Sequence, residues 1–317
     1  GIGDVFHPES TKKEDGQPQQ SCEGGPLYRA VLKSGHSEES GELILRQGHE
    51  QRSRPEKYMD NSKHREKNVS YRAPFSWTAL REFLKRIPFP LLERVEGNAI
   101  VRLLNIEDRL VKISIDSQGQ LQWWGRASQD EVEPLVGEVF ELDCTIRGRL
   151  QQHKGAEWLG EAVGLPILRY PDTFAALVTT VLEQQTNWKA ATGAIHSLLL
   201  ASHRKAYGLA LFPTPEQLVN DPTPVEQLLV THRRKAIVLE LARRFLDEPG
   251  YLDDHCYSLA EAEKRLLSLK GIGPWTARVF LSKRFGYRAL VPLNDVALQR
   301  AAAWFIKGEK GKLSPLE

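Results

Sequence analysis

The chain has 317 residues, of which 41% are hydrophobic and 26% charged, a composition typical of folded proteins. This composition excludes a fibrous or collagen-like protein, and no apolar run reaches the ~18 residues of a membrane span. Forty-three basic against 41 acidic residues give a net charge of +2, which neither indicates nor excludes a nucleic-acid partner. At roughly 100–200 residues per domain, the length allows two or three domains.

The cysteines indicate a reducing environment. Cys22, Cys144 and Cys256 are far apart and form no CxxC pair. This spacing predicts neither a disulfide framework nor a zinc or iron–sulfur site, and it favours an intracellular protein. The first residues lead directly into polar sequence, so a signal peptide is not expected.

Three regions of the chain differ in composition. Residues 1–70 are rich in Lys, Glu, Ser, Gln and Gly and contain few large apolar residues. Such a segment buries too little surface to offset the entropy cost of ordering. We therefore expect a disordered polar tail over 1–70, either solvated or partner-binding. An α/β domain over 71–163 and a helical domain over 164–317 are expected to follow.

The segment after Tyr71 combines a helix with several strands. Leu80, Phe83 and Leu84 recur at helical spacing after Ser76-Trp77, which predicts a helix there. Strands are predicted over Asn98–Ile106, Arg109–Ile115 and Leu121–Trp124. We expect an antiparallel sheet with helices against it, ending near Arg147. Trp123 and Trp124 face opposite sides of a strand, so one of them is expected in the core.

From Gly164 onward the pattern is helical, without an evident internal repeat. Thr214 and Thr223 each stand before a proline suited to the first turn of a helix, and each is predicted to cap one. Longer helices are predicted over 172–185, 188–203, 233–246 and 258–269, two of them opened by the capping residues Asp172 and Ser258.

The most informative segment is Lys270–Ala277, Lys-Gly-Ile-Gly-Pro-Trp-Thr-Ala, between two predicted helices. Gly271 and Gly273 permit a backbone path that a Cβ would obstruct, and Ile272 is expected between the helices. Pro274 suits the first turn of the second helix. Because that helix begins with unpaired N–H groups and partial positive charge, a phosphate can approach the glycines closely. An ordinary helical corner, with glycines kept for packing, is the alternative.

Leu269–Ala277, followed by Val291-Pro-Leu-Asn-Asp295, resembles the helix-hairpin-helix and aspartate signature of base-excision DNA glycosylases, in the 3-methyladenine DNA glycosylase II branch. Segments upstream also resemble that branch: Tyr71–Trp77, Arg94–Gly97, Phe140–Asp143 and Asp172–Gln185. The likeness spans about Tyr71–Ile306. It implies an α+β, mainly α fold: a TATA-binding-protein-like antiparallel sheet domain, then an all-α helix-hairpin-helix body.

The resemblance also implies an activity, the hydrolysis of the N-glycosidic bond of alkylated purines of the 3-methyladenine and 7-methylguanine type. The reaction would use base flipping in duplex DNA and leave an abasic site. Asp295 matches the catalytic aspartate, whose carboxylate can stabilise an oxocarbenium-like sugar and orient or deprotonate water. Trp275 stands where bifunctional members carry a nucleophilic lysine, so no lyase step is expected. Asp295 also suits the N-cap of a helix over Val296–Phe305, a compatible role.

Further residues receive roles through the resemblance. Trp275 is expected to form a wall of the base pocket, since an indole face attracts cationic bases by ~0.5–2 kcal/mol; core packing is the alternative. The expected DNA-contacting residues are Lys270, Gly271, Ile272, Gly273, Thr276, Gln184 and Gln185. Polar helix-end residues are the simpler interpretation of the two glutamines. Arg233, Arg234 and Lys235 contact either phosphates or solvent.

No cofactor is required by this interpretation. The resemblance implies at most a monovalent cation, Na⁺ or K⁺, on the backbone carbonyls of Leu267, Leu269 and Ile272. No four clustered cysteines follow Asp295, so an iron–sulfur cluster is not expected. The implied partner is double-stranded DNA with damaged bases, not a membrane. A monomer is expected in the cytoplasm or nucleoid, or in the nucleus of a eukaryote.

Three alternatives stay open from the sequence. A noncatalytic helix-hairpin-helix DNA-binding module would need neither an aspartate at this spacing nor so large a scaffold. A glycosylase for adenine or for oxidised bases would differ only in the shape of its pocket. Finally, Ser314-Pro-Leu-Glu317 resembles the start of a helix, so we expect further C-terminal helices. Without them the chain would be less stable or inactive.

Overall fold

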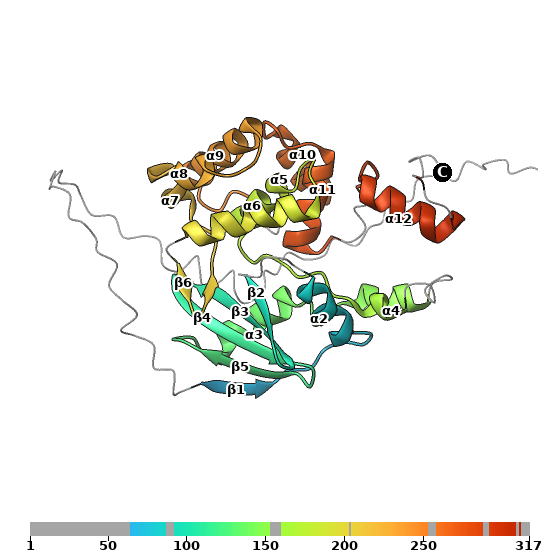
Figure 1. Cartoon of the computed structure of the whole chain (residues 1–317). Coiled ribbons are helices and arrows are strands. Elements are labelled where there is room, and N and C mark those ends of the chain that lie inside the picture. Colours follow the sequence, from blue (N-terminus) through green and yellow to red (C-terminus); the bar gives the residue numbers. More distant parts are fainter. Residues whose placement is uncertain are drawn as a thin grey trace, which may run out of the picture. The chain divides into compact units, whose positions relative to one another are not determined.

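The computed structural model describes residues 64–86, 92–152, 160–202, 204–252, 258–287, 292–308 and Gly311 (Figure 1). All of them belong to one compact unit, Ser40–Glu317. Residues 1–63 of the expected tail and the expected helix start at Ser314–Glu317 lie outside the described residues. Within the described ranges, no helix is both long and apolar enough to cross a membrane.

A five-stranded antiparallel sheet forms the first part, in the order β1-β5-β4-β3-β2. Its strands are β1 (Arg65–Asn68), β2 (Glu93–Glu96), β3 (Ala99–Ile106), β4 (Arg109–Asp116) and β5 (Gln120–Trp124). The expectation that order begins near Tyr71 is wrong by several residues, because Arg65 of β1 pairs with Trp123 of β5. This strand is polar and is held at the sheet edge by backbone hydrogen bonds, which composition does not reveal.

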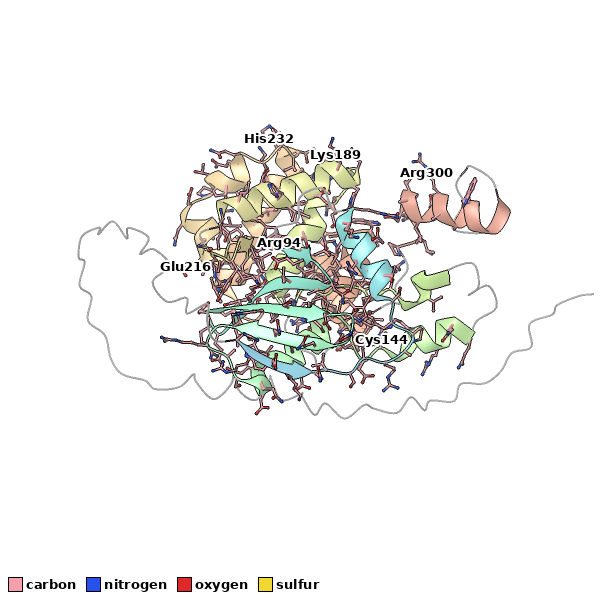
Figure 2. The ribbon with its side chains drawn as sticks, turned by 60° about the horizontal axis from the view of Figure 1, so that its bottom comes forward. Arg94, Cys144, Lys189, Glu216, His232 and Arg300 are labelled. Carbon is pink, nitrogen blue, oxygen red and sulfur yellow. The ribbon has the colours of Figure 1, made fainter. Side chains whose placement is uncertain are left out.

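One core lies between this sheet and two helices, α2 (Trp77–Lys85) and α3 (Gln129–Val139). Trp123 is 3% exposed within it, whereas Trp124 is only half-buried, as strand alternation predicted. The opposite face of β3 packs on a small hairpin, β6 (Lys205–Ala206) and β7 (Leu209–Ala210), which explains the unbroken apolar run in β3. Arg94 on β2, which Figure 2 labels, lies on this side of the sheet. Its guanidinium also donates to the carbonyl oxygen of Tyr207 in the hairpin, at 3.3 Å.

A buried arginine holds the chain in place where it leaves the sheet. Arg147, on α4 (Thr145–Gln152), is 0% exposed and donates to the carbonyl oxygens of Pro74 and Glu141, each at 2.8 Å. The Glu141 carboxylate also forms ion pairs with Arg147 at 3.4 Å and with Arg169 at 3.3 Å. These bonds join the segment at Pro74 to the segment that follows α3. The chain then passes through a 3₁₀ turn, η2 (Gly160–Gly164).

The rest of the described chain is helical. Its helices are α5 (Thr173–Leu182), α6 (Trp188–Ala201), α7 (Pro215–Asn220), α8 (Thr223–Glu226), α9 (His232–Asp247), α10 (Leu259–Ser268), α11 (Pro274–Phe285) and α12 (Val296–Lys307). All ten residues of α5 are buried, so this helix forms the centre of the helical core. The mixed α+β class is as predicted; the likeness of the sheet to the TATA-binding protein stays a prediction.

The helix caps follow the sequence closely, with one exception. Asp172, Thr214 and Ser258 cap α5, α7 and α10, and each side chain accepts a backbone N–H of the first turn. Thr223 was predicted to cap a helix, but it is the first residue of α8 and Pro222 is the N-cap. The Asp221 carboxylate accepts the Thr223 N–H at 3.0 Å, so the preceding aspartate stabilises this turn.

Candidate active site

The predicted glycine hairpin connects α10 to α11. Ile272 is 5% exposed and lies in the helical core, as expected. Gly273 is the N-cap of α11, Pro274 occupies the first turn, and no side chain caps the helix. The first N–H groups of α11 and the positive end of its dipole are thus left for an outside acceptor.

The two glycines of the hairpin have different reasons to be glycine. Gly271 has a φ of +89°, and a Cβ there would come within 2.4 Å of Ile237 Cδ1. Gly273 has an ordinary φ of −100°, and a Cβ there would meet nothing within 4 Å. The prediction that both positions exclude a Cβ is therefore right for Gly271 and wrong for Gly273. The packing of the described residues does not require glycine at 273, where the structure leaves open space.

A cleft of about 760 Å³ opens beside the hairpin. It is lined by four segments: the loop 183–187 after α5, the start of α9 with Thr231, Arg233 and Arg234, the hairpin residues Gly271 and Gly273–Thr276, and the start of α12 at 294–297. Asp295 and both glycines therefore line the same cleft, although they come from different parts of the sequence.

Both carboxylate oxygens of Asp295 are held by hydrogen-bond donors. Oδ1 accepts the backbone N–H of Leu298 at 2.8 Å, so Asp295 is the N-cap of α12, as predicted. Oδ2 accepts the indole Nε1–H of Trp275, also at 2.8 Å. These bonds fix the orientation of a half-buried carboxylate at the wall of the cleft. No motif or spacing in the sequence indicates the contact with Trp275.

Trp275 is half-buried and lines the cleft. Trp275 is not part of the helical core that the described residues form. The structure therefore does not support the core-packing interpretation of this residue. Its side chain combines an aromatic surface at the cleft with an N–H group that is bound to Asp295.

The glutamine pair divides between two environments. Gln184 is half-buried, and its side-chain nitrogen donates to the Gly271 carbonyl oxygen at 3.0 Å and to Thr276 Oγ1 at 2.9 Å. Gln185 has a left-handed φ of +46° and an exposed side chain. Both residues were predicted to contact DNA and both line the cleft, but Gln185 has the exposed side chain, whereas Gln184 is half-buried.

The remaining predicted DNA contacts also separate by exposure. Lys270 is exposed, whereas the side chains of Ile272 and Thr276 are buried, so a DNA contact by those two would have to use backbone atoms. Arg233 is exposed at the cleft, and no described residue forms a hydrogen bond or ion pair with its side chain. Arg234 donates instead to the Leu182 carbonyl oxygen at 3.0 Å. Lys235 likewise donates to the carbonyl of Glu226.

The carbonyl groups suggested for a monovalent cation lie at the end of α10 and in the hairpin. The Leu269 oxygen accepts the Ile272 N–H at 3.1 Å, which leaves its second lone pair for an ion. Among the described residues, no three or more His, Cys, Asp and Glu side chains gather as metal ligands. The carbonyl set is compatible with a cation and stays a prediction.

Comparison with known proteins supports the resemblance. No family model matches the chain. The DNA-3-methyladenine glycosylase of Bacillus subtilis is 27% identical over 255 residues, which is 71% of this chain and 80% of that protein. The structure of the Archaeoglobus fulgidus 3-methyladenine DNA glycosylase matches with a TM-score of 0.66 and 18% identity, over 79% of this chain and 89% of that one.

A second solved structure is similar in fold. It is the 8-oxoguanine glycosylase/lyase of Clostridium acetobutylicum in complex with double-stranded DNA, at a TM-score of 0.58 and 15% identity, over 75% of this chain and 82% of that one. The described chain thus has a fold similar to that of these two DNA glycosylases. The similarity to a 3-methyladenine DNA glycosylase that the hairpin and the aspartate predicted is confirmed by the Bacillus subtilis relative.

Proposed function

We propose that this chain is a monofunctional DNA glycosylase for alkylated purines, of the 3-methyladenine and 7-methylguanine type. It acts on duplex DNA by base flipping and leaves an abasic site. The observation that carries the proposal is the shared cleft, where a carboxylate with two hydrogen-bond donors lies beside an uncapped helix N-terminus. The names of the relatives support the substrate class.

In this proposal the hairpin binds the DNA backbone. A phosphate accepts the first N–H groups of α11, where the missing side chain of Gly273 leaves open space. Exposed Lys270 and Arg233 add positive charge next to the strand. A monovalent cation on the Leu267, Leu269 and Ile272 carbonyls would add positive charge beside that phosphate. The target base leaves the stack at a cost of a few kcal/mol, and Gln185 enters the gap.

The chemical step needs no covalent bond to the protein. The glycosidic C–N bond breaks with its electron pair leaving on the base, so a cationic alkylated purine departs as a neutral molecule. Positive charge develops on the sugar, and the Asp295 carboxylate stabilises that charge and orients water toward the sugar carbon. Water adds its oxygen to that carbon and gives up one proton to the Asp295 carboxylate, which passes it to solvent, so the product is an abasic sugar. Trp275 offers no amine for a Schiff base, so the strand remains intact.

Trp275 has two functions in this account. Its ring face forms a wall of the base pocket, where a cationic purine gains from the electron-rich surface. Its N–H group holds the Asp295 oxygen in place. The proposed partner is damaged duplex DNA, and the proposed acting form is a monomer in the cytoplasm or nucleoid, or in a nucleus.

The test is incubation with methylated duplex DNA, followed by chromatography of the released bases and gel analysis before and after alkali. The proposal predicts free methylated purines, and strand breaks that appear only after alkali treatment. Breaks without alkali would indicate a glycosylase/lyase. Duplex binding without any released base would indicate a noncatalytic DNA-binding module. Release of bases only from parallel duplexes with mispaired adenine or an oxidised base would move the substrate to a different lesion class.

A further inference from the structure

The loop after α5 and the glycine hairpin are joined by one side chain. Gln184 follows the C-cap of α5, and both N–H bonds of its amide have acceptors on the hairpin side, the Gly271 carbonyl oxygen at 3.0 Å and Thr276 Oγ1 at 2.9 Å. These residues are 87 and 92 positions away in sequence. A single residue therefore bonds to the hairpin turn and to the first turn of α11.

Both acceptors are rigidly placed. Gly271 has a left-handed φ of +89°, and the N–H of the same peptide unit, that of Ile272, donates to the Leu269 carbonyl oxygen at 3.1 Å, which fixes the direction of the Gly271 carbonyl group. Thr276 is 3% exposed on α11. Rigid acceptors on one side and a fixed helix end on the other make the amide of Gln184 a cross-link rather than a flexible contact.

The other contacts at the end of α5 lead elsewhere. Arg234 of α9 donates to the Leu182 carbonyl oxygen at 3.0 Å. Glu183 pairs with Lys283, which lies near the far end of α11. Of the contacts that the described residues make at this helix end, those of Gln184 are the ones that reach the hairpin.

Gln185, the next residue in the chain, is the residue that the hydrogen bonds of Gln184 position. Gln185 turns the backbone through a φ of +46° and carries an exposed side chain at the cleft. We propose that Gln184 is a positioning residue that sets the distance between Gln185 and the phosphate-binding hairpin. At this distance, Gln185 enters the gap left by the same extruded nucleotide whose phosphate is bound by the hairpin. This inference rests on the proposed function and adds a residue that acts through its neighbours.

The test compares two duplexes, one with a stable abasic-site analogue and one undamaged, on wild type and on Gln184→Met. Met keeps the length of the side chain and removes the donors. We expect the preference for the abasic duplex to fall about tenfold, with binding of undamaged duplex changed less than twofold. A duplex with 2-aminopurine opposite the lesion gives a fluorescence change on binding. We expect this change to be smaller for Gln184→Met than for wild type.

Variants at the acceptor separate positioning from folding. Thr276→Val removes the hydroxyl acceptor, and Thr276→Ser keeps it. We expect Thr276→Val to reproduce part of the Gln184→Met loss, with less than an additive effect in the double variant, and Thr276→Ser to restore wild-type preference. Equal losses on both duplexes would indicate a merely structural role, and unchanged preference in Gln184→Met would also overturn the inference. If the wild type releases bases but one of these two contrary results is found, only the positioning role of Gln184 is wrong. If the wild type releases no base, the proposed glycosylase function is itself wrong.

Discussion

The indole Nε1–H of Trp275 donates to Oδ2 of Asp295 at 2.8 Å, which links the hairpin helix to the N-cap of α12. A hydrogen bond to a charged group contributes ~1.5–3 kcal/mol. The contact therefore couples the candidate wall of the base pocket to the candidate catalytic group. It separates two ways in which Trp275 could affect base release.

Trp275→Phe keeps an aromatic face and removes the donor. If the hydrogen bond matters for orientation, excision should slow by about tenfold, the equivalent of ~1.4 kcal/mol, for cationic and neutral lesions alike. Trp275→Ala should cost cationic lesions more, because it removes the ring face as well. Single-turnover rates on the two lesion classes check both expectations. A Phe variant as fast as wild type would leave the hydrogen bond without a role in the reaction.

The hairpin glycines provide a matched pair. Gly271→Ala places a Cβ against Ile237 and forces a left-handed conformation, so the free energy of unfolding should fall by at least ~1 kcal/mol. Gly273→Ala meets neither obstacle and should lower the free energy of unfolding less than Gly271→Ala does, while duplex binding weakens because a methyl group occupies the phosphate's approach. Urea titration and duplex binding measure the two effects. Full duplex affinity in a folded Gly273→Ala variant would contradict phosphate binding at the hairpin.

Local signals in the sequence were sufficient for much of the helical part. The Asp172 and Ser258 caps and the apolar spacing behind them predict α5 and α10 within a few residues, because capping is a short-range interaction. Strand β1 escaped prediction because Arg65–Asn68 is wholly polar and owes its conformation to backbone bonds with β5. The short hairpin β6–β7 was missed for a similar reason, since its strands have two residues each.

The candidate site also depends on contacts that local sequence signals do not reveal. The hairpin and the aspartate were visible as motifs, and both line the cleft. The contacts of Gln184 with Gly271 and of Trp275 with Asp295 join residues 87 and 20 positions apart. No periodicity or cap connects such positions, because tertiary packing of separate helices brings them together. The same packing buries Thr276, which the motif alone had suggested as a DNA contact.

Arg147 should be among the most sensitive positions of the fold. It is 0% exposed, and removal of its guanidinium would leave the Pro74 and Glu141 carbonyl oxygens and the Glu141 carboxylate short of a donor. Arg147→Met should lower the free energy of unfolding by about 3–5 kcal/mol. Urea unfolding measures this, with the exposed Arg243→Met on α9 as a control expected within ~0.5 kcal/mol. Similar stability of the two variants would show that the buried network contributes little.

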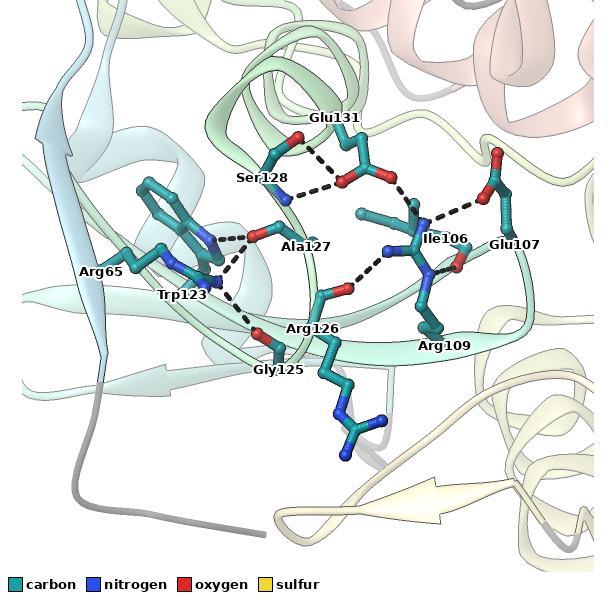
Figure 3. A network of polar contacts seen from close by, with 10 residues as sticks. All are labelled: Arg65, Ile106, Glu107, Arg109, Trp123, Gly125, Arg126, Ala127, Ser128 and Glu131. Carbon is teal, nitrogen blue, oxygen red and sulfur yellow. Dashed lines mark hydrogen bonds and ion pairs between the residues drawn. The ribbon is translucent and has the colours of Figure 1, made fainter. Parts of the chain in front are cut away.

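The start of α3 should make stability depend on pH. Hydrogen bonds from Ser128, together with the Arg109 guanidinium, lower the pKa of Glu131 to about 2 (Figure 3). A lowered pKa in the folded state stabilises above the ordinary glutamate pKa of 4.5, and this stability is lost as pH falls from 4.5 toward 2. Glu131→Gln should therefore have a lower melting temperature than wild type at pH 7, and the difference should vanish near pH 2.

Glu261 is the matched control for that experiment. It closes a capping box with Ser258 in the same way, and those hydrogen bonds lower its pKa, but its bonded partner is Ser258 and not an arginine. Glu261→Gln should show a smaller difference in melting temperature with the same sign. Equal pH profiles for the two variants would show that Arg109 adds nothing to the capping box.

The most direct test is base release by Asp295→Asn. The asparagine oxygen can still accept the Leu298 N–H, so the cap of α12 should be retained, while the negative charge and the acceptor of the Trp275 N–H are lost. Single-turnover excision of 3-methyladenine from methylated duplex should slow by at least about 100-fold, with duplex affinity largely preserved. An Asp295→Asn variant that releases the base at the wild-type rate would contradict the assignment of this carboxylate to the chemical step.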